Sequence, residues 1–190
     1  RQLRLAETQK FRHVTSFFNG KSTTPFLKED QVEVPSRFDP ASFAEHPEME
    51  AYNIVDKFIE LTASSSYQFI LVNFANGDMV GHTGSFDSAV KAVEILDECV
   101  GKIVDRVLEC DGIVLITADH GNCDQMINYE TGQVQTSHST VPVECIFIAH
   151  DSPGKSMISR GKLSDIGPTL LHLLNLDAPT QMTATNLILE

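Results

Sequence analysis

The stretch GIVLITADHGN, residues 112–122, constrains the fold of this chain more than any other stretch. Its first half is a short apolar run rich in β-branched residues, which is typical of a strand buried on both faces. The run stops at Asp119 and His120, and the glycine that follows lets the backbone turn. Because ligand sites of open α/β sheets lie at the carboxyl ends of strands, we expect these two side chains to belong to a site.

A second strand end carries similar side chains. The apolar segment 67–75 leads into Asp78 and, four residues later, into His82. If the intervening residues form a helical turn, both side chains lie on one face and can hold one cation. A third donor, His138, lies in a loop just before another apolar segment. Oxygen and nitrogen donors at three strand ends indicate two divalent cations close together, as in two-metal phosphoryl-transfer sites.

The residues by themselves leave a second interpretation open. Aspartate and glycine are common in turns, so Asp119 could cap a helix, Asp78 could belong to a turn and His120 could be an ordinary surface histidine. If the donors do bind a metal, their type fits zinc, manganese or iron and does not choose among them.

Predicted strands alternate with predicted helices along the whole chain, as judged from the period of the apolar residues. The expected strands are 13–19, 67–75, 112–118 and 143–149, with one edge strand around 32–34. The expected helices are 47–64, 86–109 and 163–174, of which the first places Met49, Tyr52, Val55 and Ile59 on one face. Residues 1–12 are expected to form a short helix or an entry segment. This alternation indicates an α/β fold with a mostly parallel sheet that carries helices on its faces.

The charge of the chain excludes two classes of partner. Asp and Glu number 26 against 14 Lys and Arg, which gives a formal net charge of −12. We therefore expect no nucleic acid and no membrane surface as a partner, and no apolar run approaches the roughly 20 residues of a membrane span. The four cysteines form no CxxC pair, so we expect reduced thiols in a cytoplasmic protein. The chain opens inside a charged, helix-like stretch at Arg1, and we expect it to be part of a longer protein.

Five segments that follow one another along nearly the whole chain carry a resemblance to a known family. They are AETQKFRHVTSFFNG (6–20), ANGDMVGHTG (75–84), ITADHGN (116–122), SHST (137–140) and KLSDIGPTLL (162–171). They resemble the cofactor-independent phosphoglycerate mutases, which are metal enzymes of the alkaline phosphatase superfamily. The resemblance implies a three-layer α/β sandwich with a mostly parallel central sheet, alkaline-phosphatase-like. It also implies an isomerase that interconverts 3-phosphoglycerate and 2-phosphoglycerate through a phosphoserine intermediate in glycolysis and gluconeogenesis.

The resemblance further implies two divalent metal ions, with Mn²⁺ as the favoured metal. Asp78, His82 and His138 match the ligands of one ion. Asp119 and His120 match ligands of the second ion. In the family, an aspartate and the nucleophilic serine from near the N-terminus of the full protein complete the shell of that second ion, and both lie outside this chain.

Lys10 matches an active-site lysine of the family that helps to position the substrate phosphate. Residues 1–190 then form the C-terminal portion of the metal-binding phosphatase-like domain, without its N-terminal segment and without the inserted domain that binds the substrate. We expect the full-length protein to be a monomer that acts on a small-molecule phosphoglycerate, and this portion alone to be inactive. The chain departs from the family at Gln9, where glutamate is common, at Ser16, where an aromatic residue is usual, and at Cys123, where alanine is common.

Two alternatives remain open. Metal ligands do not separate a mutase from other members of the superfamily, such as a phosphopentomutase or a phosphatase, because substrate choice lies in the missing insertion. Outside the enzymes, the same residues fit a non-catalytic fragment that is stabilised by a metal.

Overall fold

The computed structural model describes residues 1–64, 66–151 and 156–189. The chain divides into two compact units. Unit 1 consists of residues 1–106 and 120–143, and unit 2 consists of residues 107–119 and 144–190. Among the described residues, no helix has both the length and the apolar character that crossing a membrane requires.

Unit 1 contains a parallel three-stranded sheet. Its strands lie in the order β2 (Glu29–Val34), β1 (Gln2–Glu7) and β3 (Phe69–Asn73). Leu5 of the central strand lies between a valine of each neighbouring strand and is fully buried. The prediction of an α/β fold with parallel strands is confirmed for this sheet, and β2 is the edge strand that the sequence indicates.

β1 occupies residues for which the sequence predicts a short helix or an entry segment, so the prediction of a helix is wrong. Leu3 and Leu5 alternate with Arg4, which is the period of a strand, but the charges in the segment argue against a central strand. In the structure these charges are buried, with Arg4 2% exposed and Glu7 fully buried. The Arg4 guanidinium lies over two phenylalanine rings, at 4.7 and 4.9 Å from their centres. Such cation–π contacts help a guanidinium to leave water.

Residues 13–19 form a helical turn instead of the predicted strand. After the short turn η1 (Thr8–Lys10), the chain forms η2 (His13–Phe17), a single turn of π-helix. The residue that follows, Phe18, stacks on the ring of Phe69 at 6.0 Å between centres. Packing against the sheet therefore overrides the strand propensity of these β-branched and aromatic residues.

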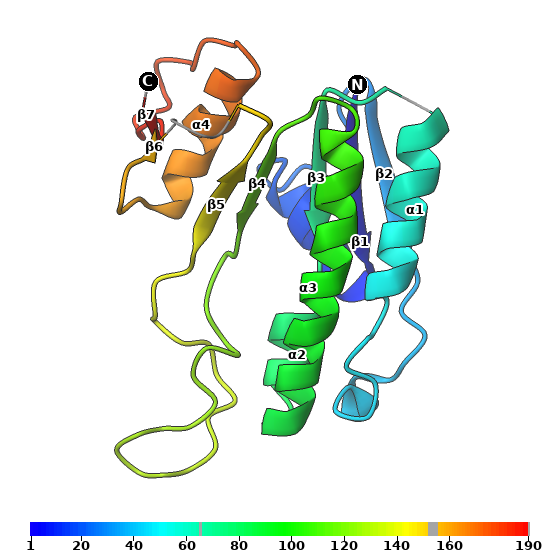
Figure 1. The fold of residues 1–190 in the computed structure, drawn as a ribbon, viewed down its shortest axis with the longest axis vertical. Coiled ribbons are helices and arrows are strands. Elements are labelled where there is room, and N and C mark those ends of the chain that lie inside the picture. Colours follow the sequence, from blue (N-terminus) through cyan, green and yellow to red (C-terminus); the bar gives the residue numbers. More distant parts are fainter. Residues whose placement is uncertain (65, 152–155, 190) are drawn as a thin grey trace. The chain divides into compact units, whose positions relative to one another are not determined.

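Helices α1 (Ala51–Ser64) and α3 (Phe86–Leu108) lie on one face of the sheet, whereas η2 lies on the other (Figure 1). α3 agrees with its predicted range. α1 begins later than predicted because Met49, at a φ of 42°, lies outside the helical region. The buried residues of α1 are Ala51, Ile54, Val55 and Phe58. Tyr52 and Ile59 are 39% and 40% exposed. The prediction that these two residues lie with Met49 and Val55 on the buried face is therefore wrong.

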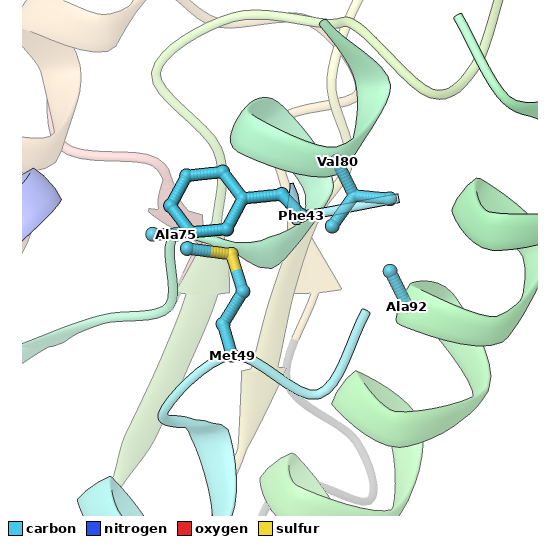
Figure 2. Packing of buried hydrophobic residues seen from close by; sticks show 5 residues of the cluster. All are labelled: Phe43, Met49, Ala75, Val80 and Ala92. Carbon is cyan, nitrogen blue, oxygen red and sulfur yellow. The ribbon is translucent and has the colours of Figure 1, made fainter. Parts of the chain in front are cut away.

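The short helix α2 (Asn76–Gly81) follows β3 and is anchored by its apolar side. Figure 2 shows the cluster of buried residues that holds it: Phe43, Met49, Ala75, Val80 and Ala92. The loop that contains the turn η3 (Pro40–Ser42) leads directly into Phe43. Asp78 and His82 lie two residues to either side of Val80, so the helical period places both on the side opposite the core.

Unit 2 contains two antiparallel strand pairs and the helix α4. The elements are β4 (Val114–Thr117) with β5 (Cys145–Ile148), β6 (Ser156–Met157) with β7 (Ile188–Leu189), and the turn η4 (Leu163–Asp165) that leads into α4 (Ile166–Leu173). β4, β5 and α4 confirm predicted elements. β4 is half-buried rather than buried on both faces, because β5 is its single paired neighbour among the described residues.

Candidate metal centre

Helix α2 places Asp78 and His82 side by side. The main-chain N–H of His82 donates to the carbonyl oxygen of Asp78 at 3.0 Å, which closes the turn. Nε2 of His82 then lies 2.9 Å from Oδ1 of Asp78. Val80 anchors the same turn in the core. The helical turn that the sequence predicts between Asp78 and His82 is therefore present, and the two side chains lie on one face of it.

Two further histidines come from the base of a hairpin-like arm, residues 120–139. A bridge joins Gly121 to Ser139 across the arm, and the main-chain N–H of Ser139 donates to the carbonyl oxygen of Gly121 at 2.9 Å. His120 and His138 each precede one of these bridged residues. Their rings stack with 3.6 Å between centres and 17° between planes, so pairing across the arm brings together two histidines that are far apart in the sequence.

Three imidazoles therefore converge on one oxygen, Oδ1 of Asp78. The Nε2 atoms of His82, His138 and His120 lie 2.9, 3.1 and 3.9 Å from it. One ligand atom each of Asp78, His82 and His138 lie within 4.8 Å of one another. The structure thus brings together four of the five side chains that the sequence predicts as metal ligands.

The hydrogen bonds of His82 determine which of its ring nitrogens is free. Nδ1 lies 2.6 Å from the carbonyl oxygen of Thr136. Because a carbonyl only accepts, Nδ1 carries the proton, and the lone pair of the neutral ring lies on Nε2. Nε2 faces Oδ1 of Asp78 and, at 3.2 Å, Nε2 of His138. A hydrogen bond from the distant ring nitrogen to a carbonyl is how proteins commonly orient a metal-binding histidine.

Asp78 is ionised and is held by a buried lysine. Lys10 is 6% exposed, and its Nζ lies 2.5 Å from Oδ2 of Asp78. Burial by itself would raise the pKa of Asp78, but the hydrogen bond and charge of Lys10, together with Asn122 and His82, lower this pKa to about 2. The side chain is therefore a carboxylate at neutral pH, as a metal ligand must be.

Asp119, the fifth predicted ligand, belongs to unit 2. It follows β4 and is exposed to solvent. Its role as a ligand of a second ion, together with His120, stays a prediction.

Cys123 lies beside the cluster but makes its own hydrogen bond. Its Sγ donates to the carbonyl oxygen of Gly77 at 2.8 Å. Burial raises the pKa of this thiol, and the charges of Asp124 and Asp78 raise it further. The side chains whose ligand atoms lie close enough to share one ion are Asp78, His82 and His138, and Cys123 is not among them.

The sequence suggests no role for Asn122, which the structure places against Asp78. Its Nδ2 donates to Oδ1 of Asp78 at 3.1 Å and to the main-chain oxygen of Asp78 at 3.2 Å. The available signal is its position directly after the Asp-His-Gly segment, since groups that support metal ligands commonly come from the same turns as the ligands.

These donors fit a divalent cation. A carboxylate oxygen with imidazole nitrogens is a donor set of zinc, manganese, iron and cobalt sites. The lone pair on Nε2 of His82 faces the negative Oδ1 of Asp78 at 2.9 Å, which is repulsive while His82 is neutral. A cation between the two groups removes this repulsion, and the grouping of Asp78, His82 and His138 therefore fits a metal site.

Comparison with known proteins relates the chain to metalloenzymes. The family model of the metalloenzyme superfamily matches residues 1–178. A 2,3-bisphosphoglycerate-independent phosphoglycerate mutase of Clostridium botulinum is 50% identical over 188 residues, covering 99% of this chain and 36% of that protein. The protein of the same name from Clostridium novyi is 48% identical over 187 residues, covering 98% of this chain and 36% of that protein.

A solved structure also resembles this chain. It is the structure of Leishmania mexicana phosphoglycerate mutase at low cobalt concentration, with a TM-score of 0.89 and 34% sequence identity. The match covers 100% of this chain and 37% of that one, so the chain has the alkaline phosphatase-like α/β fold of this neighbour. It spans 36% of the length of the two curated relatives. The family match extends over most of the sequence and includes every residue of the donor cluster, and the chain therefore belongs to the metalloenzyme superfamily.

Proposed function

We propose that this chain is the C-terminal portion of the phosphatase-like domain of a 2,3-bisphosphoglycerate-independent phosphoglycerate mutase. One observation carries the proposal: imidazoles of three separate segments converge on Asp78, in a chain about half identical to two proteins of that name. The reaction is the interconversion of 3-phosphoglycerate and 2-phosphoglycerate through a phosphoserine intermediate. It belongs to glycolysis and gluconeogenesis, and the protein works in the cytoplasm.

Two divalent cations are part of this proposal, with Mn²⁺ as the natural metal. Asp78, His82 and His138 hold one of them. Asp119 and His120 hold the other, together with an aspartate and the nucleophilic serine from outside this chain. Bound cations of this kind lower the pKa of a nucleophilic hydroxyl and neutralise the phosphoryl group that is transferred. The low cobalt concentration named for the Leishmania mexicana structure supports a divalent metal.

Lys10 contributes positive charge to the same site. Its ammonium group holds Oδ2 of Asp78, and we propose that it also positions the substrate phosphate. The net charge of −12 repels a multiply negative phosphoglycerate, so the cations and basic residues from outside the chain must complete the binding site. Residues 1–190 alone are therefore inactive, and the full-length protein acts as a monomer on this small molecule.

The proposal is tested on the full-length protein with 3-phosphoglycerate as substrate, in the absence of 2,3-bisphosphoglycerate and with added Mn²⁺. We expect 2-phosphoglycerate to form, and we expect His138→Ala to lower kcat/KM by about 100-fold or more, since even groups that only support a metal ligand contribute about 10- to 100-fold. His150→Ala is the matched control. Its Nε2 lies 2.9 Å from the carbonyl oxygen of Leu108, and His150 is not one of the grouped donors Asp78, His82 and His138, so activity should not change.

Other products would identify the alternatives. Release of inorganic phosphate without isomerisation would indicate a phosphatase, and turnover of a pentose phosphate would indicate a phosphopentomutase. Binding of Mn²⁺ without turnover of any of these substrates would indicate a non-catalytic metal-binding protein.

A further inference from the structure

Asn122 contacts Asp78 through hydrogen bonds and is not one of the candidate metal ligands. Its side chain is 6% exposed, and its Nδ2 donates to two oxygens of Asp78, Oδ1 at 3.1 Å and the main-chain oxygen at 3.2 Å. An ionised carboxylate and a carbonyl both only accept hydrogen bonds. The two acceptors therefore assign the amide orientation: the nitrogen faces Asp78 and the oxygen faces away.

The amide oxygen of Asn122 is left against Gly81. This Oδ1 is buried and has no hydrogen-bond partner among the described residues. A Cβ atom at position 81 would lie 2.2 Å from it, so glycine is needed for the side chain of Asn122 to reach Asp78. Burying a hydrogen-bond acceptor without a partner costs free energy. The favourable contacts of this amide are therefore those of its nitrogen, which binds Asp78.

Asp78 is thus held on both of its carboxylate oxygens. Lys10 Nζ lies 2.5 Å from Oδ2, and Asn122 binds Oδ1 together with the main chain of the same residue. The bond to the main chain ties the turn that contains His120 and Asn122 to helix α2. Oδ1 is also the oxygen that the imidazoles of His82 and His138 approach.

We propose that Asn122 is a positioning residue for Asp78: it orients the carboxylate so that Oδ1 faces the imidazole nitrogens before a cation binds. The inference rests on the proposed function in one respect, that this cluster binds a divalent cation. Groups that orient a metal ligand in this way typically contribute about 10- to 100-fold to metal affinity.

The test measures binding of Co²⁺ alone to the full-length protein, by calorimetry and by the visible absorption of the bound ion. Asn122→Leu keeps approximately the shape of the side chain and removes the donor. We expect its Kd for Co²⁺ to rise by about 10- to 100-fold. We also expect the absorption spectrum of the bound ion to change, because Asp78 is no longer held in one orientation.

The matched control is Asn19→Leu. Asn19 is 9% exposed, and its Nδ2 donates to both carboxylate oxygens of Glu29 at 2.8 and 3.0 Å. The control therefore removes a buried amide–carboxylate contact of the same kind from another part of unit 1. We expect it to lower Tm and to leave Co²⁺ affinity and the spectrum unchanged.

Gly81→Ala provides a second variant, which keeps Asn122 but displaces it from Asp78; it carries the test if Asn122→Leu does not fold. We expect it to weaken Co²⁺ binding as well. If the unmodified protein binds Co²⁺ and the variants at positions 122 and 81 bind it equally tightly, the inference is wrong and the proposed function stands. If Asn19→Leu weakened Co²⁺ binding as much as Asn122→Leu, the inference would also be wrong, since the loss would then follow from removing any buried amide–carboxylate contact. If the unmodified protein binds no Co²⁺, the proposed metal site fails and the inference fails with it.

Discussion

Asp78 in unit 1 and Asp165 in unit 2 both have a lowered pKa, but for different physical reasons. At Asp165, the main-chain N–H groups of Thr185 and Lys162 donate to the carboxylate at 2.9 and 2.7 Å, and these bonds lower its pKa. At Asp78, burial acts in the opposite direction, and the ion pair with Lys10 overcomes it to bring the pKa to about 2.

The two residues differ in what faces their oxygens. Each oxygen of Asp165 accepts a main-chain N–H, so this carboxylate joins the C-terminal segment to the turn before α4. Oδ1 of Asp78 instead faces imidazole nitrogens from α2 and from the arm. A lowered pKa is therefore shared by a structural carboxylate and a candidate metal ligand. The convergence of titratable side chains from separate segments is what distinguishes them.

The largest expected effect is the loss of cation binding in Asp78→Asn. The amide keeps the shape of the side chain but removes the negative charge, and it leaves Lys10 without its partner. We expect the affinity of the full-length protein for Mn²⁺ to fall by about 100-fold or more, beyond the 10- to 100-fold typical of groups that only support a ligand. Calorimetric titration with Mn²⁺ measures this directly.

Asp165→Asn is the matched control for that experiment, because it makes the same chemical change in unit 2. It should bind Mn²⁺ as tightly as the unmodified protein. Loss of binding in both variants would contradict the distinction between the two carboxylates.

A smaller effect is expected on stability at acid pH. The pKa of Asp165 is lower in the folded protein than its ordinary value of 3.8. In the pH range between the folded-state pKa and 3.8, the unfolded chain therefore binds more protons than the folded protein, and the free energy of unfolding rises with pH. The contribution of Asp165 is present above pH 3.8 and is lost as the pH falls below it. Asp165→Asn should therefore have a lower Tm at neutral pH, and the difference from the unmodified protein should narrow in acid. Thermal melts followed by circular dichroism across this range provide the test; a difference that does not vary with pH would speak against it.

The smallest effect is expected for Cys123→Ala, beside Asp78. The thiol is a weak donor, and its hydrogen bond to Gly77 should contribute less than about 1 kcal/mol to the free energy of unfolding. Mn²⁺ affinity should not change, since the thiol is not a ligand. Urea denaturation and calorimetric titration measure the two quantities, and a loss of Mn²⁺ affinity would place Cys123 in the donor set.

Most donors of the candidate site could be predicted from the sequence because each lies next to a strand or turn with a clear local pattern. Asp78 and His82 share one helical turn, and His120 lies shortly after the apolar strand β4, which ends at Thr117. The contact between Lys10 and Asp78 joins residues 68 positions apart. A pattern of neighbouring residues in the sequence cannot predict such a contact. The role of Asn122 was missed for the same reason, since it depends on where α2 lies relative to the arm.

The sequence by itself determined the elements that stand out as a continuous apolar run or as a helical repeat of apolar residues. They are β3, α3, β4, β5 and α4, and their alternation makes the fold α/β. Only the tertiary structure decided β1 and η2. Arg4 and Glu7 can lie in a central strand because other segments supply two phenylalanine rings for the guanidinium and the hydroxyl of Ser36 for the carboxylate. Whether a charge can be buried depends on partners that are distant in the sequence, whereas the period of apolar residues is local and can be read directly from it.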